Sequence, residues 1–152
     1  MKVIGYDPVI PADAELENIE RVATIEEIFE KADFVSLHLP EIPQTKKMIN
    51  KSLLSLMKPT ACLINCARGG IVDEDDLYEA LSEHKIHGAG VDVLTQEPFD
   101  KDSRLLKLDN MIVTPHDAAL NVETMNKMGL DAAQGIYEVF EGLKPSWPVS
   151  KF

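Results

Sequence analysis

The side chains of this sequence that could do chemistry follow its short apolar runs, at the points where those runs end. Arg68, Glu97 and His116 each come after such a run. A guanidinium binds anions, and an imidazole takes up or releases a proton near neutral pH. The polar positions at the ends of the runs are, in order, Asp7, His38–Pro40, Cys66–Gly70, Asp92 with Glu97, and His116. Their shared placement is the first indication of a functional site.

The elements that must position these side chains alternate between short strands and helices. Thr24 and Asn121 are suitable caps for the helices that follow them. The alternation predicts an α/β fold with a parallel sheet, and ligands of such sheets bind at the carboxyl ends of the strands. Strands are expected at Lys2–Tyr6, Phe34–Leu39, Ala61–Cys66, Gly90–Leu94 and Met111–Pro115, and helices at Ile25–Lys31, Lys51–Met57, Asp73–Glu83 and from about Val122 to Glu141.

Composition excludes several classes of function. The 152 residues are 45% hydrophobic and 27% charged, as expected of one globular domain. The net charge of −11 argues against a nucleic-acid partner and against an anionic membrane surface. The first residues do not have the pattern of a secretory signal and two cysteines do not suggest a disulfide framework, so a cytoplasmic location is expected.

Asp7 closes the first predicted strand. In a dinucleotide-binding fold, an acid at the end of the second strand accepts hydrogen bonds from the adenosine ribose and favours NAD over NADP. An Asp before a proline is also an ordinary turn residue, so Asp7 alone decides nothing. The glycine-rich phosphate loop would lie about 20 residues earlier, upstream of Met1. The motif Gly88-Ala-Gly90 precedes a strand and is interpreted as a tight turn with close backbone packing.

The most specific string in the sequence is NCARGGIVDEDD at 65–76. GVDVLTQEP at 90–98 and TPH at 114–116 follow it, while HLP, Thr45 and Lys58-Pro59 precede it. In this order and spacing the motifs resemble those of the D-2-hydroxyacid dehydrogenases, a family that includes phosphoglycerate dehydrogenase. The resemblance spans nearly the whole chain. It implies a Rossmann-like, three-layer parallel sheet that binds NAD.

The resemblance also implies a role for each of three residues. Arg68 would hold the substrate carboxylate in a bidentate geometry, although by itself it could form a surface ion pair. His116 would be the general base that takes the hydroxyl proton, or the acid in the reverse direction. Glu97 would pair with His116 and orient its ring. Outside this pattern, His116 would be a loop residue and Glu97-Pro98 an ordinary turn.

Cofactor contacts are implied at further positions that match the family. Asp92 would bind the nicotinamide carboxamide, and Ala118 would lie in the loop after His116. Leu39, Pro40 and Thr45 would line the adenosine and pyrophosphate side, with Cys66 and Ala67 beside the nicotinamide ribose.

The two cysteines do not predict a zinc site, because Cys62 and Cys66 have no companion ligands. Buried thiols are expected instead.

The family pattern has further parts upstream of residue 1: a substrate domain and the glycine-rich βα unit. Residues 1–152 are therefore interpreted as a partial NAD-binding domain that lacks the usual first strand and glycine loop. Without that central strand, we expect Lys2–Tyr6 to shift inward beside Phe34–Leu39, or a second chain to fill the edge, which favours a homo-oligomer.

Two hypotheses for function remain. The first is an NAD-dependent oxidoreductase acting on a small 2-hydroxy or 2-keto acid, with little or no turnover by the isolated chain. The second is a non-catalytic fragment, a folding or design product, or a dinucleotide-sensing regulatory module.

Overall fold

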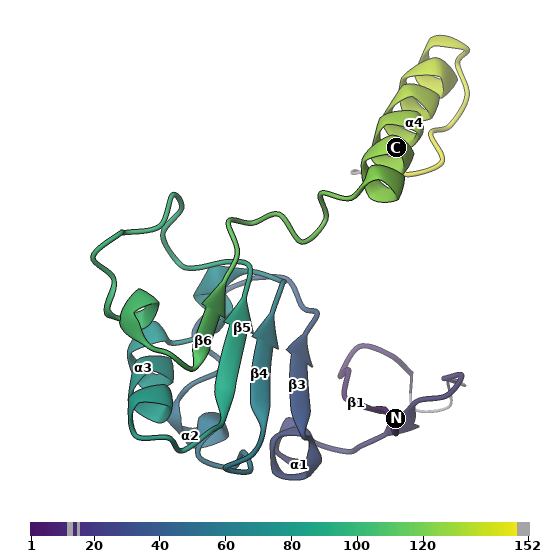
Figure 1. The fold of residues 1–152 in the computed structure, drawn as a ribbon. Helices are drawn as coiled ribbons and strands as arrows, with labels where there is room; N and C mark the ends of the chain where they lie inside the picture. The colour runs from purple at the N-terminus through teal and green to yellow at the C-terminus, as the bar shows by residue number, and fades with distance from the viewer. Residues whose placement is uncertain (12–13, 15, 149–152) are drawn as a thin grey trace. The chain divides into compact units, whose positions relative to one another are not determined.

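The computed structural model describes residues 1–11, 14 and 16–148. The chain forms two compact units, Met1–His116 and Asp117–Phe152. Each unit has its own set of elements (Figure 1).

A four-stranded parallel sheet forms the centre of the first unit (Figure 1). Its strands pair in the order β3-β4-β5-β6, and Ser36, Ile64, Gly90 and Ile112 lie side by side across it. The predicted parallel α/β sheet is confirmed. The strands are β3 (Phe34–Leu37), β4 (Cys62–Asn65), β5 (Gly88–Val91) and β6 (Met111–Val113), and the helices of this unit are α1 (Ile25–Lys31), α2 (Lys51–Leu54) and α3 (Glu74–Ser82), with 3-10 turns at Gly69–Ile71 and Arg104–Lys107.

The hydrophobic core lies between one face of this sheet and the three helices. Alternate strand residues point into it, because successive side chains of a strand face opposite sides. On the other face Phe34 and Ile112 are 65% and 71% exposed, so within residues 1–11, 14 and 16–116 the helices cover one face only. The buried set includes Val35, Leu37, Leu63, Ala89 and Val91 from the strands and Phe29, Leu54, Leu77 and Leu81 from the helices.

The predicted inward shift of the first strand is wrong. Strand β1 (Ile4–Gly5) pairs in parallel with β2 (Glu20–Arg21) in a separate two-stranded sheet. A Cβ atom on Gly5 would lie only 2.9 Å from Ile19, so the glycine permits this close approach. A cavity of about 670 Å³ remains between the segment Met1–Ile4 and strand β3. Completion of this edge by a second chain stays a prediction.

The predicted caps Thr24 and Asn121 are confirmed: each accepts a hydrogen bond from a backbone N–H of the first helical turn. Asn50 caps α2 in the same way. Asp73 caps α3 in the same way and accepts two such bonds. The turn expected at Gly88–Gly90 is instead the start of β5, although a Cβ on Gly88 would come within 2.8 Å of the Asn110 carbonyl oxygen, as close packing requires.

The second unit consists of helix α4 (Val122–Phe140) and the segment after it. The carboxylate of Glu138 binds this segment: it accepts hydrogen bonds from the Ser146 backbone N–H at 2.6 Å and from the Ser146 hydroxyl at 2.8 Å. Lys127 lies over the Trp147 ring at 5.8 Å. Across the described residues, every helix is too short or too polar to cross a membrane.

Candidate active site

Arg68 lies directly beyond the carboxyl end of β4, on a backbone fixed by a buried asparagine. Asn65 is 1% exposed. Its side-chain amide donates to the Arg68 carbonyl oxygen at 3.0 Å and accepts from the Ala67 N–H at 3.0 Å. The Arg68 side chain itself is exposed, and its only hydrogen bond within the described residues is to the Ala67 carbonyl oxygen, at 2.6 Å. A fixed backbone with an exposed guanidinium suits the binding of an anion.

Neighbouring atoms lie close to both glycines after Arg68: backbone atoms at Gly69 and a flexible side chain at Gly70. A Cβ atom on Gly69 would lie 2.1 Å from the backbone carbonyl carbon of Leu94. A Cβ atom on Gly70 would meet the Glu41 carboxylate, with its Oε1 at 2.3 Å. Gly69 therefore packs the Arg68 segment against the chain that leaves β5, while Gly70 packs it against the loop after β3.

The ends of β4, β5 and β6 are linked by a chain of hydrogen bonds through Asp92. The Asp92 N–H donates to the Asn65 carbonyl oxygen at 2.9 Å, and the His116 N–H donates to the Asp92 carbonyl oxygen at 2.9 Å. Asp92 as a whole is 3% exposed, and its carboxylate accepts a hydrogen bond from the Thr114 hydroxyl at 2.5 Å. These bonds join the backbone before Arg68 and the backbone of His116 to the end of β5, which lies between β4 and β6.

Glu97 and His116 form the predicted pair. The Glu97 carboxylate lies 2.9 Å from Nδ1 of His116, and both side chains are between a third and a half exposed. The backbone of His116 is left-handed, with φ of 58°, a conformation that is strained for a residue other than glycine. With Nδ1 bound to Glu97, Nε2 is the ring nitrogen that can face a substrate.

Of the residues expected on the cofactor side, Leu39, Pro40, Cys66 and Ala67 line one cavity of about 650 Å³ beside Arg68. Thr45 closes the loop at its edge: its hydroxyl donates to the Pro40 carbonyl oxygen at 2.7 Å and accepts from the Ile42 N–H at 2.9 Å. The expectation of buried thiols is wrong, since Cys66 is exposed and Cys62 is partly so. The cavity is lined by Leu37, His38, Leu39, Pro40, Glu41, Cys66, Ala67 and Arg68.

Asp7 lies beyond β1, outside the four-stranded sheet. Its carboxylate accepts from the Val9 N–H at 2.8 Å. The Arg21 guanidinium donates to three backbone carbonyls in the following segment, those of Asp7, Ile10 and Pro11. A small cavity of about 170 Å³ adjoins Asp7 and is lined by Gly5, Tyr6, Ile10, Leu16, Ile19 and Arg21. Ala118 belongs to the second unit, and its place in the site stays a prediction.

Sequence reasoning missed Asn65 and Thr114 as members of this site. Both are polar residues at the end of an apolar run, and a buried polar side chain at such a position needs hydrogen-bond partners. In the described ranges no group of three His, Cys, Asp or Glu side chains could hold a metal ion.

The chain is similar to known proteins over most of its length. It is 46% identical over 143 residues to the D-3-phosphoglycerate dehydrogenase of Methanocaldococcus jannaschii, which covers 93% of this chain and 27% of the relative. It is 40% identical over 145 residues to the glyoxylate reductase of Korarchaeum cryptofilum, with 95% and 44% covered. Among solved structures, D-lactate dehydrogenase with NAD⁺ from Lactobacillus jensenii superposes with a TM-score of 0.86 at 31% identity, covering 99% of this chain and 48% of that one.

The chain thus spans between about a quarter and a half of the length of these relatives. Residues 1–118 match the NAD binding domain of a family of D-isomer specific dehydrogenases. This match covers more than half of the chain and includes the Arg68, Glu97 and His116 positions. The chain belongs to the D-isomer specific 2-hydroxyacid dehydrogenase family.

Proposed function

We propose that this chain supplies the acid–base and carboxylate-binding groups of an NAD-dependent dehydrogenase that interconverts a 2-hydroxy acid and a 2-keto acid. The observation that carries the proposal is the Glu97–His116 pair at 2.9 Å, at the same edge of the sheet as Arg68, with β5 between the strands that precede Arg68 and His116. An imidazole held at Nδ1 by a carboxylate presents Nε2 to a substrate hydroxyl, as acid–base catalysis requires.

The roles follow from the chemistry of the side chains. Arg68 holds the substrate carboxylate through two N–H groups of its guanidinium and so orients the neighbouring carbon. Nε2 of His116 takes the hydroxyl proton in the oxidation direction and returns it in the reduction direction. Glu97 keeps the ring in place and compensates the positive charge that His116 gains. NAD, when bound, supplies the hydride acceptor.

The residues of the chain fit the two ends of such a dinucleotide. The cavity lined by Cys66, Ala67 and Arg68 can take a nicotinamide ribose. The exposed carboxylate of Asp7, beside its own small cavity, can accept hydrogen bonds from the hydroxyls of an adenosine ribose. Asp92, at the end of β5, would bind the nicotinamide carboxamide.

The test is the oxidation of NADH with small 2-keto acids by the chain joined to the upstream parts typical of the family, followed by the absorbance of the reduced nicotinamide. His116→Gln should lower turnover by about 10²- to 10⁴-fold, the usual share of acid–base catalysis. Arg68→Lys should mainly raise KM for the keto acid, because the ammonium cannot bind both carboxylate oxygens in one plane. Equal loss on all 2-keto acids and on substrates without a carboxylate would contradict the role of Arg68.

A second candidate is a dinucleotide-binding module without catalysis. The observation that favours it is the lack, in residues 1–11, 14 and 16–148, of a glycine-rich turn between a strand and a helix to hold the pyrophosphate. NADH fluorescence and turnover together separate the candidates: saturable binding without turnover, when the chain is joined to the upstream parts typical of the family, supports the module. We expect little or no turnover from the chain by itself, and full activity when upstream parts typical of the family are present.

A further inference from the structure

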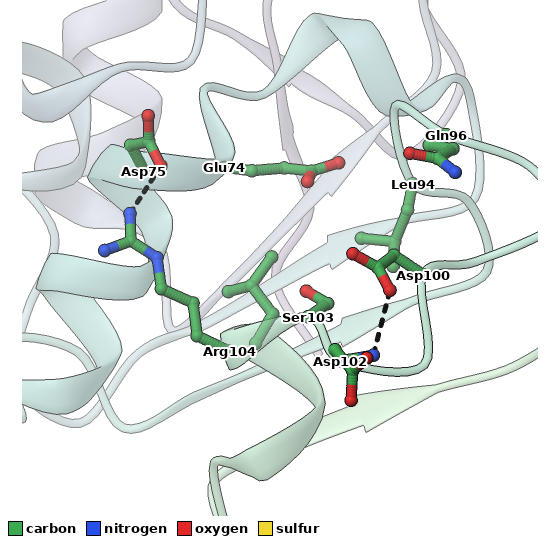
Figure 2. Close-up of a pocket in the computed structure, with 9 residues that line it drawn as sticks. Glu74, Asp75, Leu94, Gln96, Asp100, Asp102, Ser103 and Arg104 are labelled. Carbon is green, nitrogen blue, oxygen red and sulfur yellow. Dashed lines mark hydrogen bonds and ion pairs between the residues drawn. The ribbon is translucent and has the colours of Figure 1, made fainter.

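The loop that carries Glu97 is fixed to helix α3 at both of its ends. This loop, residues 95–104, leaves the sheet after β5 and ends where the 3-10 turn Arg104–Lys107 begins. Figure 2 shows its far end, with Arg104 reaching toward Asp75 while Glu74 points toward the near end.

At the near end, the Thr95 N–H donates to the Glu74 carboxylate at 2.6 Å. One residue earlier, the backbone of Leu94 rests on Gly69. Gly69 and Glu74 both belong to the segment that carries Arg68, so the start of the loop and the anion-binding residue share one support.

At the far end, the Arg104 guanidinium forms an ion pair with Asp75 and stacks over the Tyr78 ring, 4.2 Å from its centroid. These residues lie in the first two turns of α3. The next residue, Leu105, is 1% exposed and belongs to the core, which places Arg104 at the boundary between the loop and the packed part of the unit.

Between its two ends, the loop borders a cavity. This cavity, of about 410 Å³, lies between the loop and the start of α3 and is lined by acidic and polar side chains together with Leu94 and Leu105 (Figure 2). Asp100 organises the turn by accepting from the Asp102 N–H at 2.9 Å. In the middle of the loop the partly buried Phe99 packs against the core, so this contact and the two end anchors together set where Glu97 lies.

We propose that Glu74 and Arg104 are positioning residues that hold the loop closed so that Glu97 meets Nδ1 of His116. Neither touches the reacting atoms. They act through the loop backbone, and the helix start that anchors the loop is continuous with the Arg68 segment. The inference rests on the proposed function for its catalytic meaning, but the geometry it predicts is measurable without cofactor or substrate.

The test uses Arg104→Gln in the full chain, with Lys51→Gln as the matched control. Lys51 also forms an exposed ion pair with α3, to Glu79, but this pair does not touch the loop. Arg104→Gln should increase amide hydrogen exchange in residues 95–102 about fivefold, the size expected when an exposed ion pair and a cation–π contact are lost together. Lys51→Gln should leave exchange in the loop unchanged.

The decisive measurement is the tautomer of neutral His116, read from its ¹⁵N NMR shifts at alkaline pH. Bound to Glu97, the ring carries its proton on Nδ1, whereas a free imidazole carries it mainly on Nε2. Arg104→Gln and Glu74→Ala should each raise the Nε2–H population about fivefold, and Arg104→Lys should restore most of the Nδ1–H form. Faster exchange with an unchanged tautomer would overturn the proposal, as would an equal response to Lys51→Gln. Failure to bind NADH would count against the proposed function and leave this result standing.

Discussion

Replacement of Gly69 by alanine tests the idea that the Arg68 segment is held by contact with the chain leaving β5. The new Cβ would lie 2.1 Å from the Leu94 carbonyl carbon and 2.5 Å from the Thr95 nitrogen, where ordinary contact begins at 3.4 Å. A backbone must therefore move by more than 1 Å, and neither neighbour can rotate out of the way. We expect Gly69→Ala to lower the free energy of unfolding of the first unit by roughly 2–3 kcal/mol, the upper range for overpacking.

Two further glycines provide matched controls. At Gly70 the obstacle is the end of the flexible Glu41 side chain, so Gly70→Ala should cost less than about 1 kcal/mol. At Gly129, inside α4, nothing lies within 4 Å of the new Cβ, and alanine should stabilise the second unit by about 0.5–1 kcal/mol through its helix propensity.

Urea unfolding followed by two probes separates these effects. Trp147 is the one tryptophan of the chain and lies in the second unit, so its fluorescence reports on α4, while circular dichroism also follows the first unit. The double variant Glu41→Ala/Gly70→Ala should recover the small loss at Gly70. Equal losses for Gly69→Ala and Gly70→Ala would refute the reasoning, because the two obstacles differ in their freedom to move.

Three other predictions follow from the described contacts. The Gln134 side chain, together with the Ser146 hydroxyl and backbone N–H, holds the pKa of Glu138 below its usual range. The stability that ionised Glu138 contributes is therefore present above the unfolded pKa of about 4.3 and is lost as pH falls through the lower folded pKa. Trp147 fluorescence should change in that pH range, and Glu138→Gln should abolish the change. Cys66 is exposed in the cavity beside Arg68, so NADH should slow its alkylation, while equal rates with and without NADH would place the dinucleotide elsewhere. If a second chain completes the edge of β3, gel filtration should show a dimer that a charged residue at exposed Phe34 weakens, and a wild-type monomer would refute completion by a second chain.

The sequence predicted those features that depend on local chemistry. Helix α1 begins after Thr24 and ends at Lys31 as expected, because a capping hydroxyl and two early acids specify a helix start without distant partners. The Glu97–His116 contact was also foreseen, since motifs at successive ends of parallel strands converge on one edge of the sheet.

Features that depend on distant partners were missed. Strand β2 has only two residues, too few to show an alternating pattern, and it pairs with β1 through Ile4 opposite Glu20. Gly88 was expected in a turn, but it begins strand β5, where the absence of a side chain allows the strand to lie close to the Asn110 carbonyl. The exposure of Cys66 depends on the open cavity next to it rather than on the residue type.

The position of His116 as the last residue of the first unit has a consequence for protein engineering. Its backbone N–H is bound by Asp92 and its ring by Glu97, both within that unit. Shortening or exchanging the second unit should therefore preserve the acid–base pair. A chain that ends soon after Ala118 would be a minimal scaffold on which substrate-binding domains of different specificity could be grafted.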